Sequence, residues 1–322
     1  MPYPARLPRD LPEALPFSFD LIAPGVSPRV PDPNLLGIEV SDPALAALCG
    51  LGNIDPQHTP GAAATVPAAI EASLHAPLPP AGSRLVTVRP DLDAFGAMAV
   101  LCLRALGRRV DAAMTERISR IAALDRHDRG PWPGPRPLPR TAQDFAEDWP
   151  GADLAQLGAC MRDRSLMMEQ RVRAMLHWLE TEAVPEGYHD GIAASHAALL
   201  RSLRLGTTIV ETALQGRVAV VKSTHPGALG LGYRRAKIVV ALNPVFAFTK
   251  DMVGRKYTIA RWSAGDADLD VVAHRLGAIE PGWGGQSGIT GSPQFAPSAL
   301  TLDQVLCALH SVLCVKGSEA DG

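Results

Sequence analysis

Two carboxylates, one residue apart, stand where an apolar strand pattern changes to a helical one. In the segment LVTVRPDLDAFGAMAVLCLRALG (85–107), Asp91 and Asp93 follow the apolar start. Ligands of parallel α/β sheets bind beyond the carboxyl ends of the strands, so a site is expected here. Two adjacent carboxylates repel each other unless a cation lies between them. The spacing favours a metal site, although a helix cap at Asp91 and a first-turn acid at Asp93 explain the same residues.

Two further segments carry metal-ligand residue types after short apolar runs. NIDPQH offers Asp55 and His58, and LDRHDRG offers Asp125, His127 and Asp128. Carboxylates with imidazoles suit Mn²⁺, Zn²⁺ or Fe²⁺, and carboxylates with water suit Mg²⁺. Taken singly, NIDPQH is better explained by a loop histidine and LDRHDRG by a solvated helix end. Together the three acidic turns predict one divalent-metal site, with Mn²⁺ or Mg²⁺ as the cofactor.

A glycine-rich segment near the carboxyl end, PGWGGQSGITGSPQ (281–294), predicts an anion-binding loop. Gly284 and Gly285 leave backbone N–H groups accessible to an anion, and Ser287 adds a hydroxyl donor. Lys256 lies in the same half of the chain and is a candidate contact for phosphate oxygens. A loop that only forms a turn remains the alternative.

The pattern of elements predicts an α/β protein of two lobes. A Pro-rich arm (1–34) precedes a parallel-sheet lobe with the metal-site acids (35–150), which the Pro-rich stretch GPWPGPRPLPR closes. Helical segments form a connector (151–205), and strands return in a smaller α/β lobe (206–322) that carries the glycine-rich loop and binds substrate.

The segment RPDLDAFGA resembles the first motif of the DHH phosphoesterase superfamily, His-x-x-Pro-Asp-x-Asp-Ala-x-Gly-Ser. The matching residues are Pro90, Asp91, Asp93, Ala94 and Gly96, while Thr87 stands in the place of the histidine. The resemblance implies that the carboxylates hold a pair of divalent cations. It also implies catalytic roles for Asp91 and Asp93, with Asp125 or Asp128 completing the cation shell.

The second half of the chain carries a weaker resemblance to the same superfamily. WGGQSGITGSP is similar to its Gly-Gly-His-x-x-Ala-Ala-Gly loop, with Gln286 in the place of the histidine. STHPGALGLG is a competing match, which makes His225 a candidate substrate contact. The chain has no Asp-His-His sequence, and DPQH lies upstream of the first motif rather than downstream.

Composition narrows the function classes. Of the 322 residues 20% are charged, and the formal net charge is −2, so a long nucleic acid is not an expected partner. No apolar run is long enough to span a membrane, and the five cysteines form no CxxC pair. We therefore expect a cytoplasmic protein with a small phosphorylated substrate, either as a monomer or as a homodimer.

Three functions fit these features. The first is a metal-dependent phosphohydrolase acting on a phosphate-containing small molecule or a short oligonucleotide, with Asp91, Asp93 and Asp125 as catalytic residues. The second is a non-catalytic nucleotide- or phosphate-binding protein on the same fold, which Thr87 and Gln286 favour. The third is an α/β enzyme that uses the acids for general acid and base chemistry.

Overall fold

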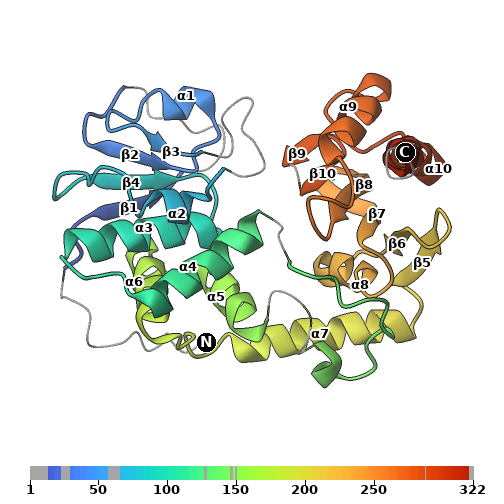
Figure 1. The fold of residues 1–322 in the computed structure, drawn as a ribbon, viewed down its shortest axis with the longest axis horizontal. Coiled ribbons are helices and arrows are strands. Elements are labelled where there is room, and N and C mark those ends of the chain that lie inside the picture. Colours follow the sequence, from blue (N-terminus) through green and yellow to red (C-terminus); the bar gives the residue numbers. More distant parts are fainter. Residues whose placement is uncertain are drawn as a thin grey trace. The chain divides into compact units, whose positions relative to one another are not determined.

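The chain divides into two compact units, each with its own hydrophobic core (Figure 1). The computed structural model describes residues 14–22, 30–56, 66–126, 129–145, 148, 151–286 and 288–318. The first unit comprises the described residues of 1–125 and 150–192, and the second unit those of 126–149 and 193–322. Within the described residues, no helix is both long and apolar enough to cross a lipid bilayer.

A four-stranded parallel sheet forms the base of the first unit. Its strands, in sheet order, are β1 (Ser18–Leu21), β4 (Arg84–Thr87), β2 (Leu35–Ile38) and β3 (Asn53–Ile54). β1 falls in the segment expected to be an arm, but Phe17 and Phe19 are buried in the core and fix it as an edge strand. Because the four strands are parallel, their carboxyl ends share one edge of the sheet.

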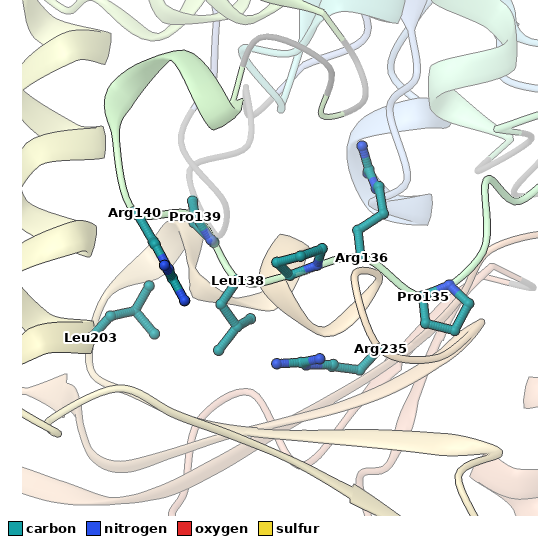
Figure 2. A pocket seen from close by; sticks show the side chains of 8 residues that line it. Pro135, Arg136, Leu138, Pro139, Arg140, Leu203 and Arg235 are labelled. Carbon is teal, nitrogen blue, oxygen red and sulfur yellow. The ribbon is translucent and has the colours of Figure 1, made fainter.

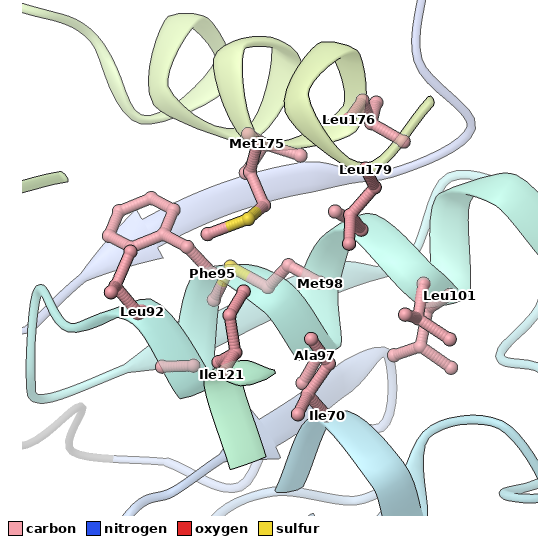
Figure 3. Packing of buried hydrophobic residues seen from close by; sticks show 14 of the residues in the cluster. Ile70, Leu92, Phe95, Ala97, Met98, Leu101, Ile121, Met175, Leu176 and Leu179 are labelled. Carbon is pink, nitrogen blue, oxygen red and sulfur yellow. The ribbon is translucent and has the colours of Figure 1, made fainter. Parts of the chain in front are cut away.

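Helices cover both faces of this sheet. α1 (Pro43–Ala46) packs on one face, where its Leu45 joins a small cluster with Leu35 and Val86. The other face is covered by α2 (Ala69–Ala72), α3 (Leu92–Ala105), α4 (Ala112–Asp125), α5 (Ala152–Arg162) and α6 (Met168–Thr181). Every residue of α3 from Leu92 to Leu103 is buried, as expected of a helix that is apolar on all sides. Figure 3 shows Phe95 and Met98 of α3 packed beside Met175 of α6. This packing places α5 and α6 in the first unit, although the sequence suggested a separate connector.

The second unit contains a mixed sheet of six strands. In sheet order they are β5 (Ile209–Ala213), β6 (Val218–Lys222), β7 (Ile238–Thr249), β8 (Met252–Arg261), β10 (Ile289–Gly291) and β9 (Gly284–Gln286). Only β6 and β7 pair in parallel, and the other neighbours are antiparallel. The predicted α/β class, with a parallel sheet in the first lobe, is confirmed.

Helices and short turns complete the second unit. They are two 3₁₀ turns (Ala142–Phe145 and Pro226–Ala228), α7 (His189–Arg204), α8 (Leu229–Gly232), α9 (Leu269–Ile279) and α10 (Leu302–Ser318). The division between the units falls inside α7, between Ile192 and Ala193. The core between the sheet and helices α9 and α10 includes Tyr257, Leu276 and Leu309.

Candidate metal centre

Carboxylates gather at the carboxyl edge of the parallel sheet, where β2 and β4 end side by side. Glu39 follows β2 directly, and Asp91 and Asp93 follow β4 at the start of α3. Asp125 is the last residue of α4. Each of these side chains therefore stands at the end of an element that the core of the first unit holds in place.

Three of the carboxylates form a group that could hold a metal ion. One oxygen from each of Glu39, Asp93 and Asp125 lies within 4.8 Å of the others. Glu39 is 2% exposed and Asp93 is 1% exposed, whereas Asp125 is half-buried, so two of the three carboxylates are withdrawn from solvent. Burying carboxylates together is costly unless a cation or protons compensate their charge. The ligand atoms that the described residues offer here are three carboxylate oxygens, which suit a hard cation such as Mg²⁺ or Mn²⁺.

Glu39 has two further features that single it out. Its φ is +51°, in the left-handed region that residues other than glycine rarely adopt. Its Oε2 atom is buried and makes no hydrogen bond to any described residue. The backbone N–H of Glu39 donates to Ile54 O of β3 at 3.0 Å, which fixes the strained residue between two strands. An orphaned buried oxygen beside two other carboxylates is the arrangement that a bound cation would satisfy.

Asp93 is held by the backbone of α2. Its two oxygens accept hydrogen bonds from Ala69 N at 2.7 Å and from Ile70 N at 2.9 Å. This contact needs α2 and α3 to lie close together, and Gly96 allows it because a Cβ there would lie 2.4 Å from Ile70 Cδ1. Each oxygen of Asp93 keeps a lone pair, so these two hydrogen bonds do not prevent metal binding.

Asp91 is the N-cap of α3, as the capping interpretation predicted. Its carboxylate accepts a hydrogen bond from Ala94 N at 3.0 Å, and its negative charge helps to raise the pKa of Glu39. Asp91 is not one of the three carboxylates of the compact group. It therefore lies beside the candidate metal centre, at the start of α3.

The pKa values of Glu39 and Asp93 are both raised, because burial and the neighbouring negative charges disfavour ionisation. Burial raises the pKa of Glu39, and the charges of Asp91, Asp93 and Asp125 raise it further. Burial also raises the pKa of Asp93, as does the charge of Asp125, whereas the hydrogen bond from Ile70 N lowers it. Without a cation, the folded protein thus favours protons on these carboxylates.

The other residues expected at the metal site have different outcomes. Asp55 follows β3 at the same sheet edge but is not part of the three-carboxylate group. His58, His127 and Asp128 lie outside the described residues. Thr87, at the place of the family histidine, is buried, and its Oγ1 accepts a hydrogen bond from Arg89 N at 3.2 Å.

Glu39 is the residue that sequence reasoning missed. It terminates the apolar run LLGI, so the rule that pointed to Asp91 and Asp93 applies to it as well. A single acid at the end of a short strand is common, however, and its neighbours in space come from the start of α3 and the end of α4. The proximity of Glu39 to Asp93 depends on the pairing of β2 with β4.

The glycine-rich segment of the second unit forms a hairpin rather than an open loop. β9 pairs antiparallel with β10, with Gly285 opposite Thr290 and Gly284 opposite Gly291. A Cβ on Gly285 would lie 2.3 Å from Ile289 O, so glycine is needed there for the close approach of β10. The position of a Cβ on Gly284 faces open space. The hairpin thus gives Gly285 a structural role that needs no anion.

The remaining candidate substrate contacts are already partly engaged. Lys256 Nζ donates to Ser292 O at 2.7 Å and to Pro293 O at 2.9 Å, so it braces the chain after β10. His225 caps a 3₁₀ turn, where its Nδ1 accepts a hydrogen bond from Gly227 N at 3.1 Å. Ser287 lies outside the described residues.

Comparison with known proteins gives a distant likeness among solved structures. No protein-family model matches the chain, and no curated protein matches it. Among solved structures, the chain is similar to the pGpG-specific phosphodiesterase PggH from Vibrio cholerae. The identity is 10% and the TM-score is 0.38, over 68% of this chain and 73% of the other.

Proposed function

We propose that the protein is a divalent-metal-dependent phosphoesterase that acts on a small phosphorylated molecule or a short oligonucleotide. The observation that carries this proposal is the group formed by buried Glu39 and Asp93 with half-buried Asp125, one oxygen of each lying within 4.8 Å of the others. The resemblance of RPDLDAFGA to a phosphoesterase motif adds the reaction class. The orphaned Oε2 of Glu39 supports a cation as the missing partner.

The chain itself supplies the placement of the reacting groups. Glu39, Asp93 and Asp125 would hold the cation, which when bound would neutralise phosphoryl charge and lower the pKa of a water molecule. The backbone of α2 orients Asp93, and Asp91 fixes the start of α3. Burial lowers the pKa of Arg162, at the end of α5, and the negative charge of the nearby Asp91 opposes this shift. We propose that this guanidinium faces the substrate phosphate, since the site has a surplus of negative charge.

In the second unit, the candidate substrate contacts still have hydrogen-bond donors available. Lys256 Nζ has three N–H donors and uses two of them on backbone carbonyls. His225 accepts at Nδ1, which leaves Nε2 to donate. We propose that these two side chains and the unobstructed backbone at Gly284 are phosphate contacts of the second unit, taken by itself.

Metal binding and hydrolysis should both depend on Glu39. In the wild-type protein, Mn²⁺ at a hundredfold excess over its dissociation constant should stabilise the fold by about 2.7 kcal/mol. Glu39→Gln should lose most of this stabilisation and the Mn²⁺-dependent hydrolysis of bis(p-nitrophenyl) phosphate. Glu116→Gln, an exposed change on α4, is the matched control and should behave as wild type. Thermal melts and initial rates, each with Mn²⁺ or with EDTA, measure these effects.

The same experiment tests the second candidate, a non-catalytic phosphate-binding protein. That function is favoured by Thr87, which hydrogen-bonds the backbone of Arg89 where the resemblance requires a histidine. It predicts stabilisation by Mn²⁺ that depends on Glu39, with no hydrolysis by the wild type. Equal stabilisation of wild type and Glu39→Gln would refute the metal centre and both functions that use it.

A further inference from the structure

A cavity in the second unit is lined in part by the Pro-rich segment 130–140. It measures about 520 Å³, within the range of about 300–1,000 Å³ that is usual for small-molecule sites. All of its lining residues belong to the second unit, from the Pro-rich segment, the end of α7 and the turn after α8. None of them is among the residues considered for the metal centre.

The Pro-rich segment is fixed in place by a buried arginine. Arg234 is 5% exposed, and its Nη1 donates to Pro137 O at 2.8 Å. Arg136 N donates to Arg234 O at 2.7 Å, so the two segments are joined in both directions. Trp132 adds a third link, because its Nε1 donates to Tyr233 O at 2.8 Å. One wall of the cavity is therefore held rigidly against the residues that form the other.

Two arginines contribute positive charge to this cavity. Figure 2 shows the guanidinium groups of Arg140 and Arg235 pointing from opposite sides toward the space beside Leu138. Among the described residues, neither guanidinium forms a hydrogen bond or an ion pair. The nearby carboxylate of Asp144 instead accepts the backbone N–H groups of Arg140 and Thr141.

The third arginine of the cavity provides an internal contrast. Arg136 points away from the space in Figure 2 and pairs with Asp148 at 3.2 Å. Two like charges that converge on one space repel each other, and an anion between them removes that cost. Guanidinium groups also match the geometry of phosphate oxygens.

The rest of the lining is apolar. Leu138, Pro139 and Leu203 line the same cavity as the two arginines. Leu138 and Leu203 pack against a buried cluster of the second unit, which gives this wall a fixed shape. An inorganic anion would leave such a wall uncovered, whereas an organic phosphate with a planar or apolar body would cover it.

We propose that this cavity is a binding site for a phosphomonoester with a planar or apolar body, its phosphate held between Arg140 and Arg235. The rigid attachment of the Pro-rich segment through Arg234 pre-organises the two guanidinium groups. The site needs no metal ion and uses no residue of the carboxylate group. It is thus independent of the proposed phosphoesterase activity.

Calorimetric titration of the full chain in EDTA tests this site with three probes: adenosine 5′-monophosphate, inorganic phosphate and adenosine. Using the Glu39→Gln background removes the candidate metal centre from the measurement. Adenosine 5′-monophosphate should bind more tightly than phosphate, and adenosine should not bind detectably. Its affinity should also fall as NaCl is raised from 0.1 M toward 1 M, because salt screens the contact.

Variants of the two arginines assign the binding to this cavity. Arg235→Ala and Arg140→Ala should each weaken adenosine 5′-monophosphate binding about tenfold, which is typical for losing hydrogen bonds to a charged group. Arg109→Ala, an exposed change in the first unit, should leave the affinity unchanged. Because Arg140 is exposed, its variant should fold even if Arg235→Ala does not.

Three results would overturn the proposal. No binding of either phosphate-containing probe would exclude a phosphate site. Affinity unchanged in both arginine variants would place the binding elsewhere. Equal affinity for phosphate and adenosine 5′-monophosphate would exclude a role for the apolar wall. Each result can occur whether or not the carboxylate group binds metal.

Discussion

At the scale of single residues, Glu39 has three unusual features. It combines a left-handed backbone, burial and an unsatisfied carboxylate oxygen. Such a conformation costs of order 1–3 kcal/mol and persists only where the surroundings impose it. Two backbone hydrogen bonds provide that restraint: Glu39 N donates to Ile54 O, and Glu39 O accepts from Ser41 N. The strain therefore coincides with the residue to which we assign metal binding.

The pKa shift of Glu39 predicts how stability depends on pH in the absence of metal. A carboxyl group whose pKa is raised by folding stabilises the fold while it is protonated. That contribution is lost as the pH rises from the unfolded value, about 4.3, through the raised folded value. In EDTA, wild type should lose stability relative to Glu39→Gln over this window, since the amide cannot ionise.

Thermal melts of both proteins at a series of pH values from 4 upward measure this difference. Glu116→Gln is again the control, and its melting temperature should follow that of wild type at every pH. Mn²⁺ should reverse the trend, because the cation binds the ionised carboxylates and its stabilisation grows with pH. Parallel curves for wild type and Glu39→Gln in EDTA would contradict the raised pKa.

At the scale of elements, the structure assigns clear roles to short segments. α2 has only four residues, yet its first N–H groups hold Asp93, and Ile70 packs over Gly96 of α3. β9 and β10 have three residues each, and their pairing explains Gly285. In both cases a glycine permits the close approach of a neighbour, by admitting a side chain at Gly96 and a backbone at Gly285.

The hairpin of β9 and β10 allows a direct comparison of two adjacent glycines. Gly285→Ala places a Cβ 2.3 Å from Ile289 O and 2.8 Å from Thr290 Cα, so backbone must shift. Overpacking of this kind typically costs about 1–3 kcal/mol. Gly284→Ala meets no atom within 4 Å and should be neutral or slightly stabilising.

Urea unfolding curves of the two variants and wild type measure this contrast. A large loss at Gly285 and none at Gly284 is the expected outcome. Similar stability of the two variants would mean that β10 does not approach Gly285 as closely as the structure places it. Phosphate titration of both variants then asks separately whether either glycine contacts an anion.

At the scale of the whole molecule, the chain forms two units with separate cores. Leu85, Phe95 and Trp178 belong to the core of the first unit, and Val240 and Tyr257 belong to that of the second. The carboxylate group lies entirely in the first unit, and the arginine-lined cavity lies entirely in the second. Each proposed site is therefore built from residues of a single core.

This arrangement predicts that metal binding stabilises one unit selectively. Mn²⁺ at a hundredfold excess over its dissociation constant should slow the exchange of the best-protected amides of the first unit by up to about a hundredfold. Amides of β2, β4 and α3 should respond, and those of β6 and β7 should change little. Hydrogen exchange read by mass spectrometry measures both sets in one experiment, with Glu39→Gln as the control. Equal slowing in both sheets would contradict independent units.

The points at which strands and helices begin and end could be predicted from the sequence. Apolar runs followed by acids located the end of β4, the start of α3 and the end of α4, and the alternation of strands and helices predicted the α/β class. Such features depend on residues that are close in sequence, so periodicity and capping rules detect them. They were enough to select Asp91, Asp93 and Asp125 as candidate residues.

Tertiary structure alone decided which of these candidates meet. The order of strands in a sheet is set by contacts between distant segments, so no local rule places Glu39 beside Asp93. The helices α5 and α6 belong to the first unit because their apolar faces pack against α3, which their own sequence does not specify. In the same way, the need for glycine at position 285 depends on the strand that lies opposite it. The shared cavity of Arg140 and Arg235 also depends on which segments pack together. The residue types determine which chemistry is available, and long-range packing determines where in the fold those residues meet.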